Sequence, residues 1–113
     1  MMTGQEYKDS LRKRNIIVYF KGKQIPAKEI PDNPYLRGHV NSAALTYDLA
    51  FDPTCEELMT ATSHLTGKKI NRFTHIHQSV DDLIKKVKML RMISLKTGTC
   101  YQRCVGFDAM NAT

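Results

Sequence analysis

A chain of 113 residues has room for one domain at most and for a modest hydrophobic core. Three cysteines, with no signal peptide and no apolar run of membrane length, indicate a cytoplasmic protein with no disulfide framework and no membrane partner. The formal net charge of +6 raises the question of an anionic partner. The basic residues are dispersed and no nucleic-acid-binding motif accompanies them, which favours solvated faces or phosphate-bearing small molecules over nucleic acid.

The chain begins with a helix signal followed by a hairpin signal. Thr3 and Glu6 have the spacing of a capping box, and the residues after them recur at helical spacing, which predicts a short helix over about residues 4–14. β-branched and aromatic residues fill positions 16–20, and a Lys-Gly-Lys turn separates them from Gln24-Ile25. This arrangement predicts a small β-hairpin.

Three prolines separate this hairpin from a second helix. They lie between residues 26 and 34, so residues 27–37 are expected to form an extended loop that ends at Gly38. From His39 the apolar residues recur every three or four positions, which predicts a helix that closes at Asp52-Pro53. The apolar positions of this helix are Val40, Ala43, Ala44, Tyr47, Ala50 and Phe51.

A second hairpin is predicted in the middle of the chain. Residues 58–65 and residues 69–73 flank the polar sequence Thr66-Gly67-Lys68, which has the composition of a turn. Alternation of polar and apolar residues in these two strands is weak. The expected architecture is therefore mainly α-helical with two small β-hairpins.

The clearest helix signal follows this hairpin. Ser79 and Asp82 have capping-box spacing and predict a helix over about residues 80–96. Asp81 and Asp82 each lie four residues before a base of the Lys85-Lys86 pair, which suits both ion pairing and the helix dipole. The stripe expected to face the core is Val80, Leu83, Ile84, Val87, Leu90 and Ile93 or Ser94.

A pair of cysteines follows this helix. Gly98 can end the helix, and Thr99 with Gln102 can cap the start of another, which would place Cys100 and Cys104 on one face at its positive end. Thiolates are favoured there, and they are ligands for soft metals. Two buried small residues are an equally good interpretation of the pair, and two thiols supply only half of the ligands of a zinc or iron–sulfur site.

Other candidate site residues carry weaker signals. Cys55 is interpreted as a structural thiol beside Pro53. His75 and His77 could share a metal if the backbone is extended, but ordinary polar contacts are favoured because no third ligand is nearby in the sequence. Arg91 and Arg103 carry guanidinium groups suited to phosphate or carboxylate, with solvated surface charge as the alternative.

The apolar pattern is still running at the end of the sequence. Val105, Phe107, Ala109 and Met110 begin a helix-like pattern with no glycine cap, proline or polar tail after it. We therefore expect the sequence to be the front part of a longer protein.

Beyond these patterns, the sequence resembles the N-terminal region of the 4-hydroxyphenylacetate 3-hydroxylase family of flavoproteins, in particular its dehydratase branch. The most specific motif is Thr97-Gly-Thr-Cys-Tyr-Gln-Arg-Cys, which continues as Val-Gly-Phe-Asp-Ala. Further resemblance lies in residues 58–89, in residues 3–15 and in Leu45-Thr-Tyr-Asp-Leu-Ala, so that it covers essentially all of the chain. It implies that residues 1–113 are a partial N-terminal helical domain of an acyl-CoA-dehydrogenase-like flavoprotein, without its middle β domain and C-terminal helical domain.

The resemblance also implies a chemistry. The dehydratase branch contains FAD and a [4Fe-4S] cluster, converts 4-hydroxybutyryl-CoA to crotonyl-CoA, isomerises vinylacetyl-CoA and tends to form homotetramers. Two of its cluster ligands match Cys100 and Cys104, while Arg91, Gln102 and Arg103 become candidates for contacts to the flavin or to the cluster's surroundings. Because the remaining ligands and the catalytic base would come from other domains, this chain alone is expected to be inactive.

Two alternatives remain open at this stage. One is a flavin-dependent aromatic monooxygenase of the same family, although that branch is not known for the cysteine pair. The other is a truncated, non-catalytic remnant that binds a metal or a partner chain.

Overall fold

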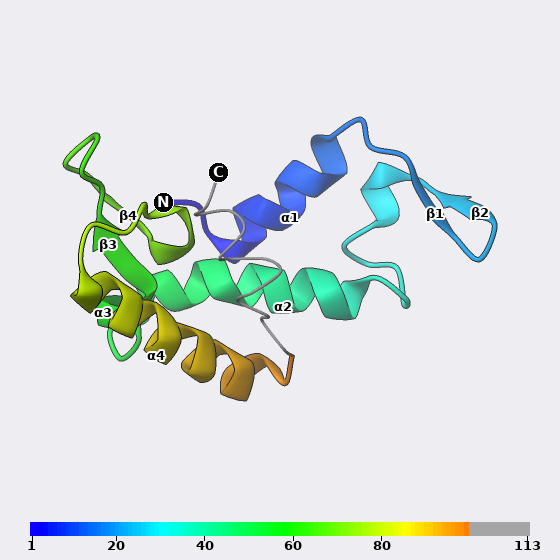
Figure 1. The fold of residues 1–113 in the computed structure, drawn as a ribbon. Helices are drawn as coiled ribbons and strands as arrows, with labels where there is room; N and C mark the ends of the chain where they lie inside the picture. The colour runs from blue at the N-terminus through cyan, green and yellow to red at the C-terminus, as the bar shows by residue number, and fades with distance from the viewer. Residues whose placement is uncertain (100–113) are drawn as a thin grey trace. The chain divides into compact units, whose positions relative to one another are not determined.

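The computed structural model describes residues 1–99, which are mainly helical with two small antiparallel sheets (Figure 1). These residues divide into two compact units, one of residues 2–48 and one that begins at Leu49. Each sheet has two strands. The predicted architecture of helices with two hairpins is therefore confirmed for the described residues.

The first unit consists of two helices, a hairpin and a 3-10 turn. Its elements are α1 (Gly4–Lys13), β1 (Val18–Phe20), β2 (Lys23–Ile25), the 3-10 turn Ala27–Glu29 and α2 (Arg37–Asp48). Its core contains Leu11, Ile25, Ile30 and Val40, with Tyr7, Val18, Phe20, Ala27 and Leu36 packed against them. Every element of the unit contributes to this core.

Helix α1 begins as the sequence predicts and packs on α2. The Thr3 side chain accepts from the Glu6 amide, and the Glu6 carboxylate accepts from the Thr3 amide at 2.7 Å, which completes the capping box. The Gly4 amide donates to Asp48 Oδ1 at 2.7 Å, and the Tyr7 and Tyr47 rings stack with centroids 4.9 Å apart. The start of α1 is thus fastened to the end of α2.

The first hairpin is confirmed, but its connection has two residues instead of the predicted Lys21-Gly22-Lys23 turn, because Lys23 belongs to β2. Val18 pairs with Ile25 and Phe20 with Lys23. Lys21 and Gly22 both have positive φ, at 50° and 76°, as a type I′ turn requires. The loop expected over residues 27–37 is shorter than predicted, because residues 27–29 form a 3-10 turn and α2 begins at Arg37, before Gly38.

The second unit begins where α2 ends. Its elements are the 3-10 turn Leu49–Phe51, α3 (Glu56–Met59), β3 (Thr60–Thr62), β4 (Lys69–Asn71), the 3-10 turn Arg72–Thr74 and α4 (Val80–Thr97). The second hairpin is confirmed, but its strands are shorter than predicted, because Leu58 and Met59 belong to α3 and Phe73 lies in a 3-10 turn. The single-turn helix α3 was not predicted.

Helix α4 has the predicted ends but a different buried face. The Ser79 side chain accepts from the Asp82 amide at 3.2 Å, and Gly98 ends the helix at φ 67°. Val80, Leu83 and Ile84, predicted to face the core, are exposed. The buried residues of α4 are Lys86, Met89, Leu90 and Ile93, and α4 packs against α3, whose Met59 is fully buried.

Among residues 1–99, no helix combines the length and the apolar character that crossing a bilayer requires.

Candidate functional site

The predicted cysteine site lies outside the described residues. Cys100, Gln102, Arg103 and Cys104 all follow Thr99, where the description stops. The residues just before this site lie at the end of α4. There the Gly98 amide donates to the Ser94 carbonyl at 3.0 Å, and the Thr97 and Thr99 hydroxyls lie 2.7 Å apart. The predicted glycine stop before the cysteine pair is therefore confirmed.

The other sequence-predicted candidates do not gather into one site. Arg91 is exposed on α4, and Cys55 is a buried thiol whose Sγ lies 3.8 Å from Asp52 Oδ2. The rings of His75 and His77 are 6.2 Å apart in an edge-to-face arrangement. Among residues 1–99 there is no group of three His, Cys, Asp or Glu side chains that could hold a metal.

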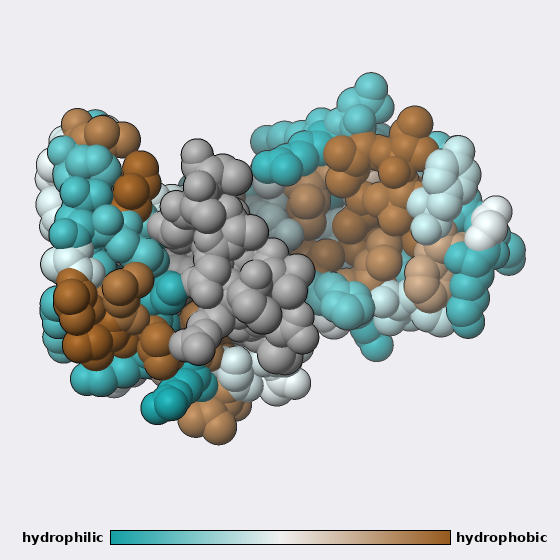
Figure 2. Space-filling model, in the orientation of Figure 1, coloured by the Kyte–Doolittle hydropathy of each residue, from teal (hydrophilic) through white to brown (hydrophobic). Residues whose placement is uncertain are grey.

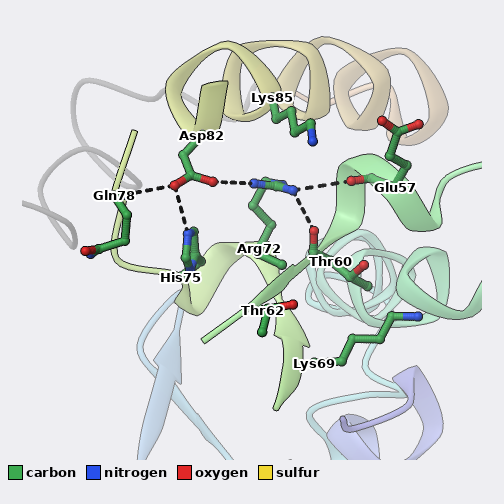
Figure 3. Close-up of a pocket in the computed structure, with 10 residues that line it drawn as sticks. Glu57, Thr60, Thr62, Lys69, Arg72, His75, Gln78, Asp82 and Lys85 are labelled. Atoms are coloured by element: carbon green, nitrogen blue, oxygen red, sulfur yellow. Dashed lines mark hydrogen bonds and ion pairs between the residues drawn. The ribbon is translucent and has the colours of Figure 1, made fainter. Parts of the chain in front are cut away.

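Sequence reasoning missed a cluster of side chains centred on Arg72. This arginine is buried, with only 3% of its surface exposed. Arg72 Nε donates to the Leu58 carbonyl at 2.7 Å, and one terminal nitrogen donates to the carbonyls of Thr60 at 2.6 Å and Glu57 at 3.3 Å. The other terminal nitrogen lies 3.4 Å from Asp82 Oδ1 (Figure 3). Arg72 therefore satisfies the carbonyls that the short helix α3 leaves open at its C-terminal end.

Asp82 is the second centre of this cluster. Its Oδ2 accepts from the Gln78 amide at 2.9 Å and from His75 Nε2 at 3.1 Å (Figure 3). Burial on its own raises the pKa of the Asp82 carboxyl, but the hydrogen bonds from Gln78 and His75 and the charges of His75 and Arg72 outweigh it and lower the pKa to about 2. Asp82 is therefore ionised at neutral pH and holds the start of α4 to the segment before it.

An open pocket of about 530 Å³ lies over the cluster. Its remaining lining comes from β3, β4 and α4, with Thr62, Lys69 and Lys85 at its sides. Lys69 pairs with Glu56, and Lys85 pairs with Asp81 at 3.1 Å, the second pair being one that the sequence predicts. The cations of this pocket are paired with carboxylates. We therefore interpret the cluster as structural, holding together α3, the 3-10 turn Arg72–Thr74 and α4, and we call it the lock.

No sequence signal pointed to this lock. The partners of Arg72 are mostly backbone carbonyls some 12 to 15 positions earlier, and backbone carbonyls carry no residue-type signature. From the sequence, Asp82 could be recognised as a capping residue and as a partner for Lys86. Its contacts with Arg72 and His75 could not be predicted, because they depend on how the segments fold together.

The fold and the sequence together define the class of this protein. The sequence profile described as 4-hydroxyphenylacetate 3-hydroxylase N terminal matches residues 3–113, and the chain belongs to this family. The structure also resembles that of the oxygenase component of 4-hydroxyphenylacetate 3-monooxygenase in complex with FAD. That likeness has a TM-score of 0.71 and 26% identity, and covers 85% of this chain and 19% of the other.

Within the family, the chain is similar to a dehydratase. It is 52% identical over 112 residues to 4-hydroxybutyryl-CoA dehydratase/vinylacetyl-CoA-Δ-isomerase of Clostridium aminobutyricum, covering 99% of this chain and 22% of that protein. The structure of an oxygen-tolerant archaeal 4-hydroxybutyryl-CoA dehydratase from N. maritimus matches with a TM-score of 0.85 and 47% identity, covering 97% of this chain and 21% of the other.

A monooxygenase of Streptomyces globisporus is less similar. This enzyme acts on a (3S)-3-amino-3-(3-chloro-4-hydroxyphenyl)propanoyl group carried by a peptidyl-carrier protein. It is 32% identical over 84 residues, which are 74% of this chain and 15% of the relative. The chain thus spans only about a fifth of the length of the relatives it matches, and it corresponds to their N-terminal segment.

Proposed function

We propose that this chain is the N-terminal segment of an enzyme that converts 4-hydroxybutyryl-CoA to crotonyl-CoA and isomerises vinylacetyl-CoA. The observation that carries the proposal is the 52% identity to the C. aminobutyricum dehydratase over 99% of the chain. The S. globisporus monooxygenase shares 32% over 74% of the chain, so the dehydratase branch is the better match in both identity and coverage.

The proposed parent protein is larger than this chain. Residues 1–113 would form part of the N-terminal helical domain of an acyl-CoA-dehydrogenase-like flavoprotein, and a middle β domain and a C-terminal helical domain would complete it. The lengths of the relatives support this arrangement, since each is about five times as long as the matched segment. We propose that the complete protein is a cytoplasmic homotetramer with an acyl-CoA substrate.

Within this proposal, Cys100 and Cys104 are two of the four ligands of a [4Fe-4S] cluster. Their donor set fits such a group, because thiolates are the usual ligands of iron–sulfur clusters. Two thiolates leave two positions to fill, and the proposal assigns the other two ligands to other domains of the subunit. When bound, the FAD and the cluster would supply redox and Lewis-acid chemistry for the loss of water.

Three further residues would support the cofactors. Gln102 and Arg103 lie between the two cysteines, and Arg91 lies nine residues before Cys100 on α4. An amide can donate a hydrogen bond to a cofactor, and guanidinium groups can hold its phosphates or a carboxylate in place. Their proposed role is to bind and orient, and the proton transfers of the reaction are left to groups of other domains.

The second candidate function is that of a flavin-dependent aromatic monooxygenase. It is favoured by the likeness to the oxygenase component of 4-hydroxyphenylacetate 3-monooxygenase, at 26% identity and a TM-score of 0.71. A non-catalytic remnant that binds a metal or a partner chain is the third.

The native gene product, purified from its source without oxygen, separates these candidates. A dehydratase subunit will be several times heavier than 12.9 kDa, will contain both FAD and iron, and will release crotonyl-CoA from 4-hydroxybutyryl-CoA. A large subunit with flavin but no iron that hydroxylates a phenol would instead establish the monooxygenase. A colourless product of 12.9 kDa would establish the remnant and overturn the catalytic assignment.

A further inference from the structure

Helix α4 has two apolar faces, and only one of them is buried. Met89 and Ile93 are fully buried and Leu90 is nearly so. On the opposite side, Val80 is 71% exposed and Ile84 is 48% exposed. A helix with only one partner normally shows an apolar stripe on one side and charges on the other.

The exposed apolar residues of α4 lie along one side of the helix, in two groups that the exposed Arg91 separates. Ile84 and Leu95 follow Val80 by four and fifteen positions, which are close to whole numbers of helical turns, and Leu83 flanks them. We call these four residues the outer stripe of α4. Leu83 is 43% exposed and Leu95 is 88% exposed, and Figure 2 shows hydrophobic residues gathered over the first turns of α4.

We propose that the outer stripe of α4 is an interdomain interface, covered in the complete subunit by an apolar surface of the polypeptide that follows this segment. The relatives carry about four-fifths of their length outside the matched region, and the archaeal dehydratase has this fold with a TM-score of 0.85. Exposure of these apolar side chains to water is unfavourable in a free domain. In the complete subunit the same side chains would be buried against another domain. The inference rests on the proposed domain arrangement and is independent of the proposed chemistry.

Arg91 defines the chemistry of the covering surface further. It follows Val80 by eleven positions and is exposed, so it lies on the same side of α4 as the outer stripe, between Ile84 and Leu95. A guanidinium that becomes buried in an apolar interface needs a carboxylate or phosphate opposite it. The group facing Arg91 is therefore anionic, either a carboxylate of the covering surface or a phosphate of the cofactor that Arg91 is proposed to hold.

Cysteine labelling tests this interface directly. Ile84→Cys is introduced into the 113-residue chain and into a hybrid subunit, in which this chain replaces the matching segment of the C. aminobutyricum relative. Leu65→Cys is the matched control, because Leu65 is 73% exposed in the loop of the second hairpin. Maleimide labelling at each position is followed by peptide mass spectrometry, so the native cysteines do not interfere.

We expect position 84 to react at least about tenfold more slowly in the hybrid than in the 113-residue chain, since interface burial excludes the reagent, while position 65 reacts at similar rates in both. Equal rates at position 84 would overturn the proposal. Slow labelling in the 113-residue chain itself would also overturn it, because that chain, or a second copy of it, would already cover the stripe.

A second measurement covers the case in which the hybrid does not accept the cysteine. Ile84→Glu should lower the melting temperature of the hybrid by at least about 5 °C, because an unpaired carboxylate would be buried, and should leave that of the 113-residue chain nearly unchanged. Leu65→Glu should be neutral in both. Sedimentation of the 113-residue chain completes the test, since a dimer that Ile84→Glu dissociates would assign the stripe to a second copy and overturn the proposal.

None of these readouts requires bound FAD, iron or turnover. Failure of the dehydratase assignment would therefore leave the labelling result unchanged, and failure of the interface would leave the assignment of Cys100 and Cys104 unaffected.

Discussion

Arg72 illustrates how one buried charge can organise several short elements. The turn α3 is too short to be stable alone, and its terminal carbonyls need donors that a four-residue helix cannot supply. Arg72 provides three such hydrogen bonds and balances its charge with Asp82. The lock therefore supplements the small hydrophobic core of this unit, in which Met59, Met89 and Ile93 are fully buried.

We expect Arg72→Ala to destabilise the 113-residue chain by about 3 kcal/mol, because it leaves buried carbonyls and the Asp82 carboxylate without their donor. Urea denaturation measures the loss. Arg37→Ala removes an exposed guanidinium and should change the free energy of unfolding by no more than about 0.5 kcal/mol. Equal effects of the two substitutions would show that the lock contributes nothing.

Because of Asp82, the stability that the lock contributes should depend on pH in the acidic range. Its pKa lies at about 2 in the folded chain, below the ordinary 3.8, so the folded state favours the ionised carboxylate. The stability that this carboxylate contributes is fully present above about pH 4 and is lost as the pH falls through about 2. The difference in urea midpoint between the natural chain and Asp82→Asn should therefore shrink as the pH falls from about 4 toward 2. A difference that does not change with pH would contradict the assignment of an ionised Asp82.

At the scale of the elements, Gly4 is a place where close packing overrides helix propensity. A Cβ at this position would lie 2.6 Å from the Ala44 carbonyl oxygen and would also meet the Asp48 carboxylate, which accepts from the Gly4 amide. The first turn of α1 thus needs a residue without a side chain in order to approach α2.

Two glycine substitutions separate these effects. Gly4→Ala should cost about 1–3 kcal/mol, because the backbone of α1 must move away from α2. Gly38→Ala, in α2 with nothing within 4 Å of the added Cβ, should instead be neutral or stabilising by up to about 1 kcal/mol. Thermal unfolding of both variants gives the comparison, and a stabilising Gly4→Ala would show that the two helices are not in close contact there.

The elements also show where sequence reasoning succeeds. The capping box of Thr3 with Glu6, the turn at Gly22 and the helix stop at Gly98 were predicted correctly, because each acts through neighbours only a few positions away. Helix α3 was missed because four residues show no period.

The buried face of α4 was predicted only in part, because the helix is apolar on both sides: Leu90 and Ile93 are buried as predicted, whereas Val80, Leu83 and Ile84 are exposed. Periodicity finds such faces but does not tell which of them has a partner within this chain. The contacts of Arg72 were missed for a related reason, since they depend on where distant segments meet. Gln102, Arg103 and the two cysteines beyond Thr99 stay predictions.

At the scale of the whole molecule, the proposed cluster needs more ligands than the cysteine pair of this chain supplies. A [4Fe-4S] cluster needs four ligands, and the proposed site supplies two of them, with the other two assigned to other domains. The cluster should therefore form only when this segment is joined to the rest of a subunit.

Anaerobic reconstitution with iron and sulfide tests this requirement. The hybrid with the C. aminobutyricum relative should bind about four irons and develop the brown absorbance of an iron–sulfur cluster, whereas the 113-residue chain should retain none after desalting. In the hybrid, Cys100→Ser and Cys104→Ser should each greatly reduce the bound iron, because a hydroxyl is a poor substitute for a thiolate. Cys55→Ala, which removes a buried thiol of the second unit, should leave the iron content unchanged. A stable cluster in the 113-residue chain, held between two copies, would contradict the assignment of the missing ligands to other domains and would make this segment a metal-binding module in its own right.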